Sequence, residues 1–227
     1  METFQRQWPI YQKLVDHNYL SHREAYAILH QVLVDECDRP FRLLELACGD
    51  AKATVEALQN TAVVHYQGVD LSKPALEMAQ QNLKRLPCEA ELEQWDFIAA
   101  LGEKTIAADV VWLSLSLHHL SLTGKGKLFA EVRQLVGDRG LFLIYEPTLR
   151  EGEKREDYLA RFEKINRPQW VELTADEWNE VFNHVKASDF PETAKTWESI
   201  AREQEFTQVR QLFVDPTDMY ALFCFHG

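Results

Sequence analysis

Three acidic residues, Glu45, Asp70 and Asp96, lie at the ends of successive segments whose apolar patterns predict β-strands. In parallel sheets that carry helices on both faces, the carboxyl ends of the strands line the ligand crevice. A carboxylate after the second strand is placed to accept two hydrogen bonds from a ribose diol, and one after the third from an exocyclic adenine amine. A single acid of this kind is usually a solvated strand end. Three in successive strands indicate a site for a nucleotide-sized ligand.

The turn after the first strand narrows the choice of ligand. Residues 45–51 contain one glycine, Gly49, and it is followed by Asp50. A dinucleotide site typically uses G-x-G-x-x-G, so that the backbone and a helix N-terminus hold a pyrophosphate. Asp50 would set a negative charge against that group. S-adenosylmethionine carries adenine, ribose and a cationic sulfonium but no phosphate, so the turn favours it over NAD.

Strand-like and helix-like segments alternate through the middle of the chain. Strands are expected at 41–46, 63–70, 91–97, 110–120 and 141–147, with helices at 51–58, 75–86 and 126–135. This order predicts an α/β protein with a Rossmann-like, doubly wound and mostly parallel sheet. Two closing strands, 207–215 and 219–226, are joined by a short turn at Pro216 and must therefore pair antiparallel.

The flanking segments are rich in helix-like spacing and are expected to cover the crevice. We predict a single domain, 1–227, made of an N-terminal helical cap (1–38), a cofactor-binding core (39–149), a helical insertion that serves as substrate cap (150–205) and a closing β-hairpin (206–227).

Composition restricts the partners. The 227 residues include 24 basic and 36 acidic side chains, for a formal net charge of −12, and no cluster of Lys and Arg stands out. Nucleic-acid affinity depends largely on basic patches, so we expect no nucleic-acid partner. The four cysteines lie far apart and form no metal-binding motif, which is typical of reduced thiols. No run approaches the roughly 20 apolar residues of a membrane span, and the N-terminal stretch lacks a signal-like apolar core. We expect a cytoplasmic protein without a membrane partner.

The ordered motifs between Phe41 and Pro147 resemble those of class I S-adenosylmethionine-dependent methyltransferases. LELACGDA resembles the first motif, GVDLS the second and QWDF the third, while DVVWLSLSLHHL and LVGDRGLFLIYEP resemble the fourth-strand and fifth-strand motifs. The resemblance implies S-adenosylmethionine as cofactor, S-adenosylhomocysteine as product and no metal. The cofactor-binding residues that it implies are Glu45, Ala47, Gly49 and Asp50 around the methionine part, Asp70 and Leu71 at the ribose, Asp96 and Phe97 at the adenine, and Leu113 and Ser114 beneath the sulfonium.

The first motif departs from the family pattern at two positions. Ala47 and Ala51 stand where the family often has glycine, on either side of Gly49. We expect Ala51 to press slightly on the first turn of the following helix.

The acceptor side of the crevice carries its own candidates. His118 and His119 follow the fourth strand and Glu146 ends the fifth, and these three are the candidate catalytic residues. Related enzymes face the transferred methyl there, although a histidine pair in an apolar run is more often structural. The candidate substrate contacts are Tyr11, Tyr19, His22, Arg150 and Tyr158, with Tyr26 as a further lid residue.

These observations predict a methyltransferase that acts on an oxygen or nitrogen atom of a small metabolite, working as a monomer or homodimer. An NAD-dependent oxidoreductase and a catalytically silent S-adenosylmethionine-binding protein remain as alternatives.

Overall fold

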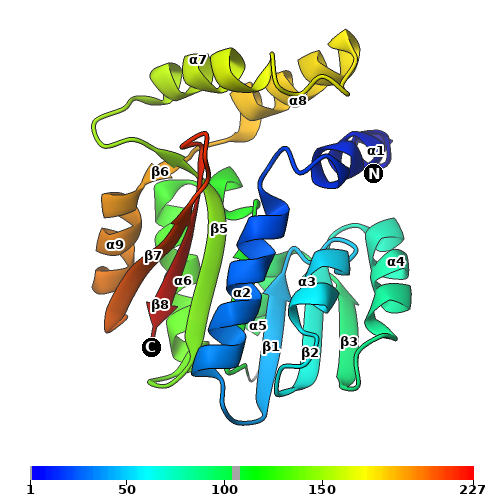
Figure 1. The fold of residues 1–227 in the computed structure, drawn as a ribbon. Coiled ribbons are helices and arrows are strands. Elements are labelled where there is room, and N and C mark those ends of the chain that lie inside the picture. Colours follow the sequence, from blue (N-terminus) through cyan, green and yellow to red (C-terminus); the bar gives the residue numbers. More distant parts are fainter. Residues whose placement is uncertain (1, 104–107) are drawn as a thin grey trace.

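The protein is built around one twisted sheet with helices on both faces, in a computed structural model that describes residues 2–103 and 108–227 (Figure 1). Met1, within the predicted cap, and residues 104–107, within the predicted core, lie outside the described residues. The strand order is β3-β2-β1-β4-β5-β8-β7. The strands are β1 (Phe41–Leu46), β2 (Val63–Asp70), β3 (Glu89–Gln94), β4 (Val110–Ser114), β5 (Leu141–Leu149), β7 (Gln208–Val214) and β8 (Tyr220–His226), with the short β6 (Glu192–Thr193) beside β5.

The first five strands are parallel, and β8 runs antiparallel between β5 and β7. The chain starts in the middle of the sheet with β1, proceeds outward to β3 and then resumes on the other side of β1 with β4. This reversal places a crevice at the carboxyl ends of β1 and β4. The predicted doubly wound, mostly parallel sheet with a closing antiparallel hairpin is confirmed.

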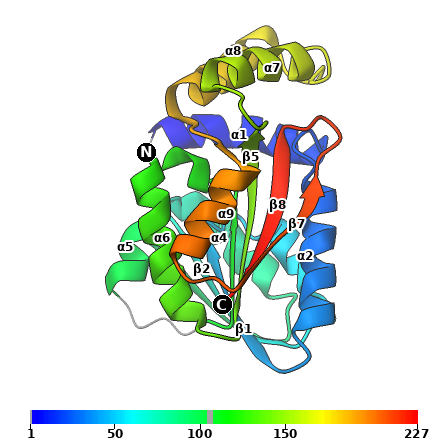
Figure 2. The same ribbon diagram turned by 90° about the vertical axis from the view of Figure 1, so that its left-hand side faces the viewer.

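Each face of the sheet buries its own apolar layer. Because side chains alternate along a strand, Leu43 of β1 packs into one layer and Leu44 into the other. The first layer is covered by α2 (His22–Glu36), α3 (Lys52–Ala57) and α4 (Lys73–Leu83), and the second by α5 (Phe97–Glu103), α6 (Leu122–Val136) and α9 (Ala194–Glu203). Figure 2 shows α6 and α9 side by side on the second face.

The predicted substrate cap, 150–205, divides into two parts. Helices α7 (Arg155–Asn166) and α8 (Ala175–Ser188) lie beyond the carboxyl ends of the strands (Figures 1 and 2). Helix α9 does not join them, because its buried stripe of Trp197, Ile200 and Ala201 packs on the sheet. The Trp197 ring stacks on Phe129 of α6 with their centroids 5.9 Å apart. Only the part of the insertion that precedes α9 therefore covers the crevice.

The N-terminal helix α1 (Glu2–Asp16) meets the cap from the other side. Tyr19, in the joint between α1 and α2, stacks on Trp170, and its hydroxyl accepts a hydrogen bond from the backbone N–H of Glu172 at 3.1 Å. Lys13 forms an ion pair with Glu177 at 2.6 Å. The N-terminal segment and residues 170–177 thus contact each other over the strand ends.

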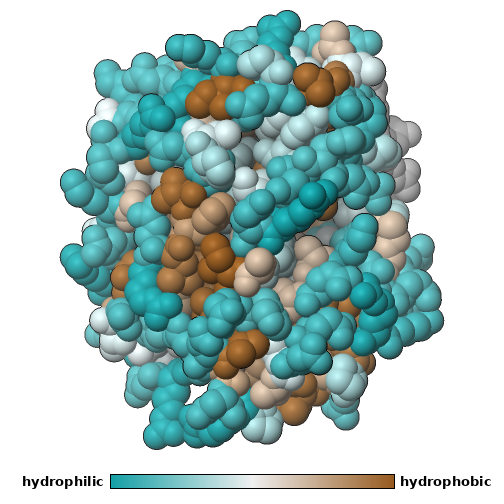
Figure 3. Space-filling view, viewed as in Figure 1, coloured by the Kyte–Doolittle hydropathy of each residue, from teal (hydrophilic) through white to brown (hydrophobic). Residues whose placement is uncertain are grey.

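The outer surface is mostly hydrophilic on the face shown in Figure 3, consistent with the acidic composition. An apolar patch lies left of centre, where Figure 1 shows the edge strand β7 beside β8 and β5. Val214 of β7 is 42% exposed. Within 2–103 and 108–227, no helix has both the length and the apolar character needed to cross a membrane.

Candidate active site

The turn after β1 has a backbone conformation that glycine favours. Ala47, Gly49 and Ala51 have φ values of 55°, 54° and 52°, so all three are left-handed. For an alanine this conformation costs roughly 1 kcal/mol because its Cβ approaches the following carbonyl. Ala51 is the N-cap residue of α3 and is 2% exposed. Because Ala51 stands where the family often has glycine, the strain lies in the backbone of Ala51, at the start of α3.

Asp70, at the end of β2, holds this turn in place. Its Oδ2 accepts a hydrogen bond from the backbone N–H of Gly49 at 2.8 Å, and its Oδ1 accepts one from Ser72 at 2.7 Å. Burial raises the pKa of Asp70, and the backbone donors of Ser72 and Gly49 oppose that shift. Each carboxylate oxygen has a second lone pair, so both can still accept a hydrogen bond from a ligand.

A cleft of about 1420 Å³ opens above this turn. Single-ligand pockets have volumes of roughly 300–1,000 Å³, so this cleft can hold two molecules. Among the described residues, six carboxylate side chains line it, against one arginine and one lysine. These are Asp16, Asp50, Glu56, Asp70, Glu180 and Asp189 against Arg23 and Lys52. The lining therefore favours a cationic ligand over a phosphate.

The structure brings many of the predicted site residues together around the cleft. The predicted residues that line it are Ala47, Gly49, Asp50, Asp70, Leu71, Phe97 and Ser114 on the cofactor side, His118 and His119 on the acceptor side, and Tyr11 and His22 from the cap. Tyr26, the further lid candidate, also lines it, with its hydroxyl 3.4 Å from Ser114 Oγ.

Two lid residues form a pair that burial keeps uncharged. The Tyr11 hydroxyl lies 3.1 Å from His22 Nε2, and the two side chains share a hydrogen bond. Burial lowers the pKa of His22 to about 4. Burial also raises the pKa of Tyr11. The lid therefore presents neutral aromatic groups to the cleft.

Three predicted cofactor residues lie outside the cleft, each for a physical reason. Asp96 caps α5, where its Oδ1 accepts hydrogen bonds from Ile98 and Ala99 at 3.0 and 3.1 Å. Leu113 is fully buried in the second apolar layer. Glu45 is 3% exposed and belongs to the opposite face of β1, since it alternates with Leu44.

Three predicted substrate contacts also point elsewhere. Arg150 is half-exposed and pairs with Asp218 at 2.5 Å on the surface. Tyr158 is fully buried inside the cap, against Phe162 and Arg161. Tyr19 joins the N-terminal helices to the segment between α7 and α8. These side chains shape the cap without lining the cleft.

Several residues that line the cleft are not among those predicted from the sequence. Trp95 had a signal, since it directly precedes Asp96 in the third motif. Trp8 had none, yet its ring lies 3.6 Å from the point where a Cβ on Gly49 would stand. His184 and Asp189 come from α8 and the segment after it, about 70 residues from the histidine pair in the chain. Only the fold brings them to the cleft.

Glu146 lies beneath the acceptor side of the cleft and holds the turn that carries the two histidines. Its side chain is fully buried, and its two oxygens accept hydrogen bonds from the backbone N–H groups of Ser116, Leu117 and His118 at 2.9–3.1 Å. Its Oε2 also lies 2.6 Å from His118 Nδ1. Burial would raise the pKa of Glu146, but the charge and hydrogen bond of His118 and the backbone donors outweigh it and lower that pKa. Glu146 therefore does not line the cleft, but it fixes the ring of His118.

His118 and His119 differ in charge preference although they are adjacent. They form the end of the short 3₁₀ turn η1 (Leu117–His119), and their ring centroids are 4.1 Å apart. For His118, burial would lower the pKa, but Glu146 and Asp189 outweigh it and raise the pKa. For His119, burial and the neighbouring His118 lower the pKa to about 4. His119 is therefore neutral at physiological pH.

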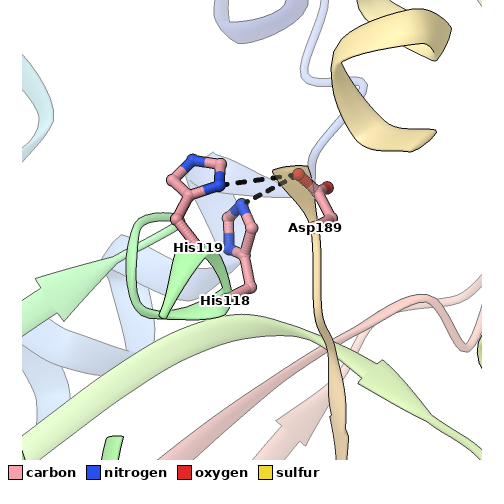
Figure 4. Close-up of side chains that lie close together, drawn as sticks. All are labelled: His118, His119 and Asp189. Carbon is pink, nitrogen blue, oxygen red and sulfur yellow. Dashed lines mark ion pairs between the residues drawn. The ribbon is translucent and has the colours of Figure 1, made fainter. Parts of the chain in front are cut away.

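Asp189 completes this group (Figure 4). Its Oδ1 lies 3.6 Å from His118 Nε2 and 3.7 Å from His119 Nδ1. Burial raises the pKa of Asp189, against the effect of His118. The cleft thus combines a turn that suits an adenosyl cofactor with a buried group of imidazole and carboxylate side chains.

Residues 43–140 match the model of a family described as a methyltransferase domain. Over this stretch, which is less than half of the chain, the protein is similar to a methyltransferase domain. The stretch contains the turn, Asp70 and both histidines, and the match confirms the resemblance to class I S-adenosylmethionine-dependent methyltransferases. No curated protein sequence matches the chain significantly.

Several solved structures share the fold of this chain. Magnesium protoporphyrin IX methyltransferase from Synechocystis PCC 6803, solved with bound S-adenosylhomocysteine, is 13% identical with a TM-score of 0.64, over 91% of this chain and 84% of that one. The cyclopropane synthase MmaA2 from Mycobacterium tuberculosis is 16% identical with a TM-score of 0.56, over 82% and 62%. An O-methyltransferase family 2 protein from Planctomyces limnophilus, in complex with apigenin, is 14% identical with a TM-score of 0.55, over 82% and 49%. The chain thus spans less than two thirds of the last two proteins.

The buried Glu45 gives the stability of the protein a specific pH dependence. Its oxygens accept hydrogen bonds from the hydroxyls of Thr54 and Tyr66 at 2.5 and 2.6 Å, and burial raises its pKa from 4.5 to about 8. Between these values the folded protein binds one proton more than the unfolded chain. The free energy of unfolding should therefore fall as pH rises through this window, by up to about 1.4 kcal/mol per pH unit.

Denaturant unfolding of Glu45→Gln across the same pH range measures this contribution. The variant should lose that part of the slope, whereas Glu89→Gln, at an exposed position of β3, should keep it. An unchanged slope in Glu45→Gln would show that Glu45 is ionised in the folded protein.

The left-handed turn gives a second prediction. Gly49→Ala should lower the free energy of unfolding by roughly 1 kcal/mol, because it places a Cβ at a positive φ. Ala51→Gly should cost much less or stabilise, since it relieves that conformation while adding unfolded-state entropy. Thermal unfolding of both variants tests this contrast, and equal losses would contradict it.

Proposed function

We propose that this protein transfers a methyl group from S-adenosylmethionine to an oxygen or nitrogen atom of a small metabolite and releases S-adenosylhomocysteine. The observation that carries the proposal is a single cleft that joins the Asp70-held turn to the histidines beyond β4. A donor and an acceptor of methyl need such a shared space, because transfer requires direct approach of the reacting atoms.

The residues present fit S-adenosylmethionine. Asp70 keeps two acceptor positions for a ribose diol, and the aromatic Trp95 and Phe97 line the cleft beside it. Gly49 has no side chain, so a ligand can approach the backbone at that position. The six lining carboxylates suit the cationic sulfonium and amino groups. The same charges disfavour the pyrophosphate of NAD.

When bound, the cofactor supplies a methyl group that its sulfonium has already made electrophilic. The protein then has to position the acceptor, exclude water and receive a proton. Tyr11, His22 and Tyr26 cover the cleft with neutral aromatic surface. His118, held by Glu146 through Nδ1, directs Nε2 toward Asp189 and the cleft. That nitrogen is placed to receive a proton from an acceptor O–H or N–H.

A small acceptor whose reacting oxygen or nitrogen carries a proton suits this site best. A buried imidazole held by a carboxylate serves O–H and N–H acceptors, whereas an alkene carbon has no proton of that kind to give up before attack. The cap formed by α1, α7 and α8 restricts access from above. The acidic lining also argues against a nucleic-acid acceptor. We expect a cytoplasmic enzyme that works as a monomer or homodimer.

The cofactor assignment is tested by calorimetry with S-adenosylmethionine and with NAD. We expect binding of the first only. Asp70→Ala should weaken it by about 1–3 kcal/mol, because charge-assisted hydrogen bonds to the ribose are lost. Asp70 also holds the turn, so Asp70→Asn and a thermal unfolding curve separate ligand contact from turn stability.

The control is Asp38→Asn, in the exposed loop before β1, which should bind as the wild type does. Unchanged affinity in both Asp70 variants would place the ribose elsewhere. Tight binding of NAD without any response to S-adenosylmethionine would instead support the oxidoreductase alternative.

The acceptor side is tested by transfer of labelled methyl to a metabolite extract. Glu146→Gln, His118→Ala and His119→Ala should each lower turnover while leaving S-adenosylmethionine affinity nearly unchanged, and for a lost acid–base group the loss is about 10²–10⁴-fold. His65→Gln, at a histidine on β2 away from the cleft, should retain full turnover.

Full activity in the three variants would show that these residues have only a structural role. Cofactor binding by the wild type without transfer to any fraction of the extract would support a silent binding protein.

A further inference from the structure

His118, His119 and Asp189 have the composition of a metal-ligand set. One nitrogen from each ring and one carboxylate oxygen all lie within 4.8 Å of one another, and the three side chains line the same cleft. In Figure 4 one ring nitrogen of each histidine faces the Asp189 carboxylate. Two imidazoles and one carboxylate, with the remaining positions open to a cleft, form a donor set that suits divalent transition metals.

Within the part of the chain that the structure describes, the carboxylate oxygen at the centre of this group has no hydrogen-bond donor. Asp189 is 6% exposed, and among residues 2–103 and 108–227 no donor reaches its buried Oδ1. A buried carboxylate oxygen is costly unless it is paired. The two histidine nitrogens stand at 3.6 and 3.7 Å, longer than a hydrogen bond but similar to the roughly 3.4 Å edge between ligands bound tetrahedrally at about 2.1 Å.

Backbone contacts hold Asp189 in this position independently of its side chain. The carbonyl of Asp189 accepts a hydrogen bond from Arg155 Nε at 2.7 Å, and its N–H donates to Val185. The next residue, Phe190, donates its N–H to the carbonyl of His118 at 2.8 Å. The segment after α8 is thus tied to the turn that carries the histidines. The carboxylate is aimed at them before any ligand arrives.

Glu146 prepares His118 for coordination. Because Nδ1 donates its proton to the Glu146 carboxylate at 2.6 Å, the lone pair of the neutral ring is on Nε2, the atom that faces Asp189. Metal-binding histidines usually have such a carboxylate or carbonyl behind them, which fixes the tautomer and the ring orientation. Glu146 itself is further held by three backbone N–H groups.

We propose that His118 Nε2, His119 Nδ1 and Asp189 Oδ1 bind a divalent transition-metal ion of the Zn²⁺ type. The nitrogen-rich donor set disfavours Mg²⁺ and Ca²⁺, which prefer oxygen ligands. His119 Nδ1 lies 3.2 Å from the carbonyl of Ser188. It gives up that contact on binding, and the proton of its neutral ring moves to Nε2. His119 is therefore the most weakly prepared of the three ligands.

The position of the site gives the ion a role that rests on the proposed function. An acceptor hydroxyl bound as a further ligand loses its proton to solvent more readily, because the ion stabilises the oxyanion. The oxygen lone pair then forms the bond to the methyl carbon, and the electrons of the breaking S–CH₃ bond return to sulfur. In this arrangement the ion takes over the proton-removing role of His118, which becomes a ligand.

Metal binding is tested on the full chain without an affinity tag, after treatment with a chelator and in the absence of S-adenosylmethionine. Titration with Co²⁺, followed by its visible d–d absorption, should show one equivalent bound and displaced by Zn²⁺. Asp189→Asn and His118→Gln should weaken binding at least about tenfold, and Glu146→Gln by about 10–100-fold if it orients His118. His65→Gln should bind as the wild type does.

X-ray absorption of the Zn²⁺-loaded wild type gives a measure that does not depend on any variant being folded, and it should show two imidazole ligands with additional oxygen. The proposal is overturned if the wild type binds no stoichiometric Co²⁺ or if Asp189→Asn binds it equally well. In that case a protonated His118 between Glu146 and Asp189 accounts for the cluster. Stoichiometric binding without methyl transfer would leave the metal site standing and contradict the proposed function instead.

Discussion

The buried carboxylate of Glu146 is the interaction on which the acceptor side depends. A charge deprived of solvent is stable only when donors surround it, and here three backbone N–H groups and one imidazole do so. Those donors come from residues that directly follow β4. The chain therefore has to turn tightly around the end of β5, and His118 and His119 are presented to the cleft as a consequence.

The same segment ties the cap to the sheet. Phe190 donates its N–H to the carbonyl of His118, and the buried Lys125 of α6 donates to the carbonyl of Phe190 and pairs with Glu192 at 2.7 Å. The path from α8 back to β6 is thus fixed by polar contacts with the histidine turn and with α6. The position of α8 relative to the histidines follows from these contacts, and the depth of the cleft follows from the position of α8.

Site residues can be predicted from the sequence where their position depends only on a strand end and on short spacing along the chain. Gly49 and Asp70 are predicted because Gly49 lies in the turn after one strand of evident pattern and Asp70 ends the next, and parallel strands must bring their carboxyl ends together. Asp96 has an equally clear signal, but its short side chain satisfies the N-terminus of α5 instead. Spacing places a residue at an edge of the sheet, whereas its hydrogen bonds decide which way it turns.

What could not be predicted depends on contacts between distant segments. Asp189 reaches the histidines because α8 ends beside η1, and nothing in its local sequence signals a ligand. Helix α9 resembles the cap helices in charge, yet its Trp197 joins the aromatic layer with Phe129. The amphipathic stripe of α9 predicts that one face of the helix is buried, but it does not identify the surface against which that face packs.

The Asp70 carboxylate links the proposed cofactor site to the strain of the turn. Ala47 and Ala51 are left-handed, at roughly 1 kcal/mol each, and a chain free to relax would leave that conformation. The bond from Gly49 to Asp70 Oδ2 and the burial of Ala51 prevent this relaxation. A ribose bound to the remaining lone pairs of Asp70 would therefore meet a carboxylate whose direction is already fixed. The free-energy cost of ordering the turn is then offset during folding, and ligand binding does not have to offset it.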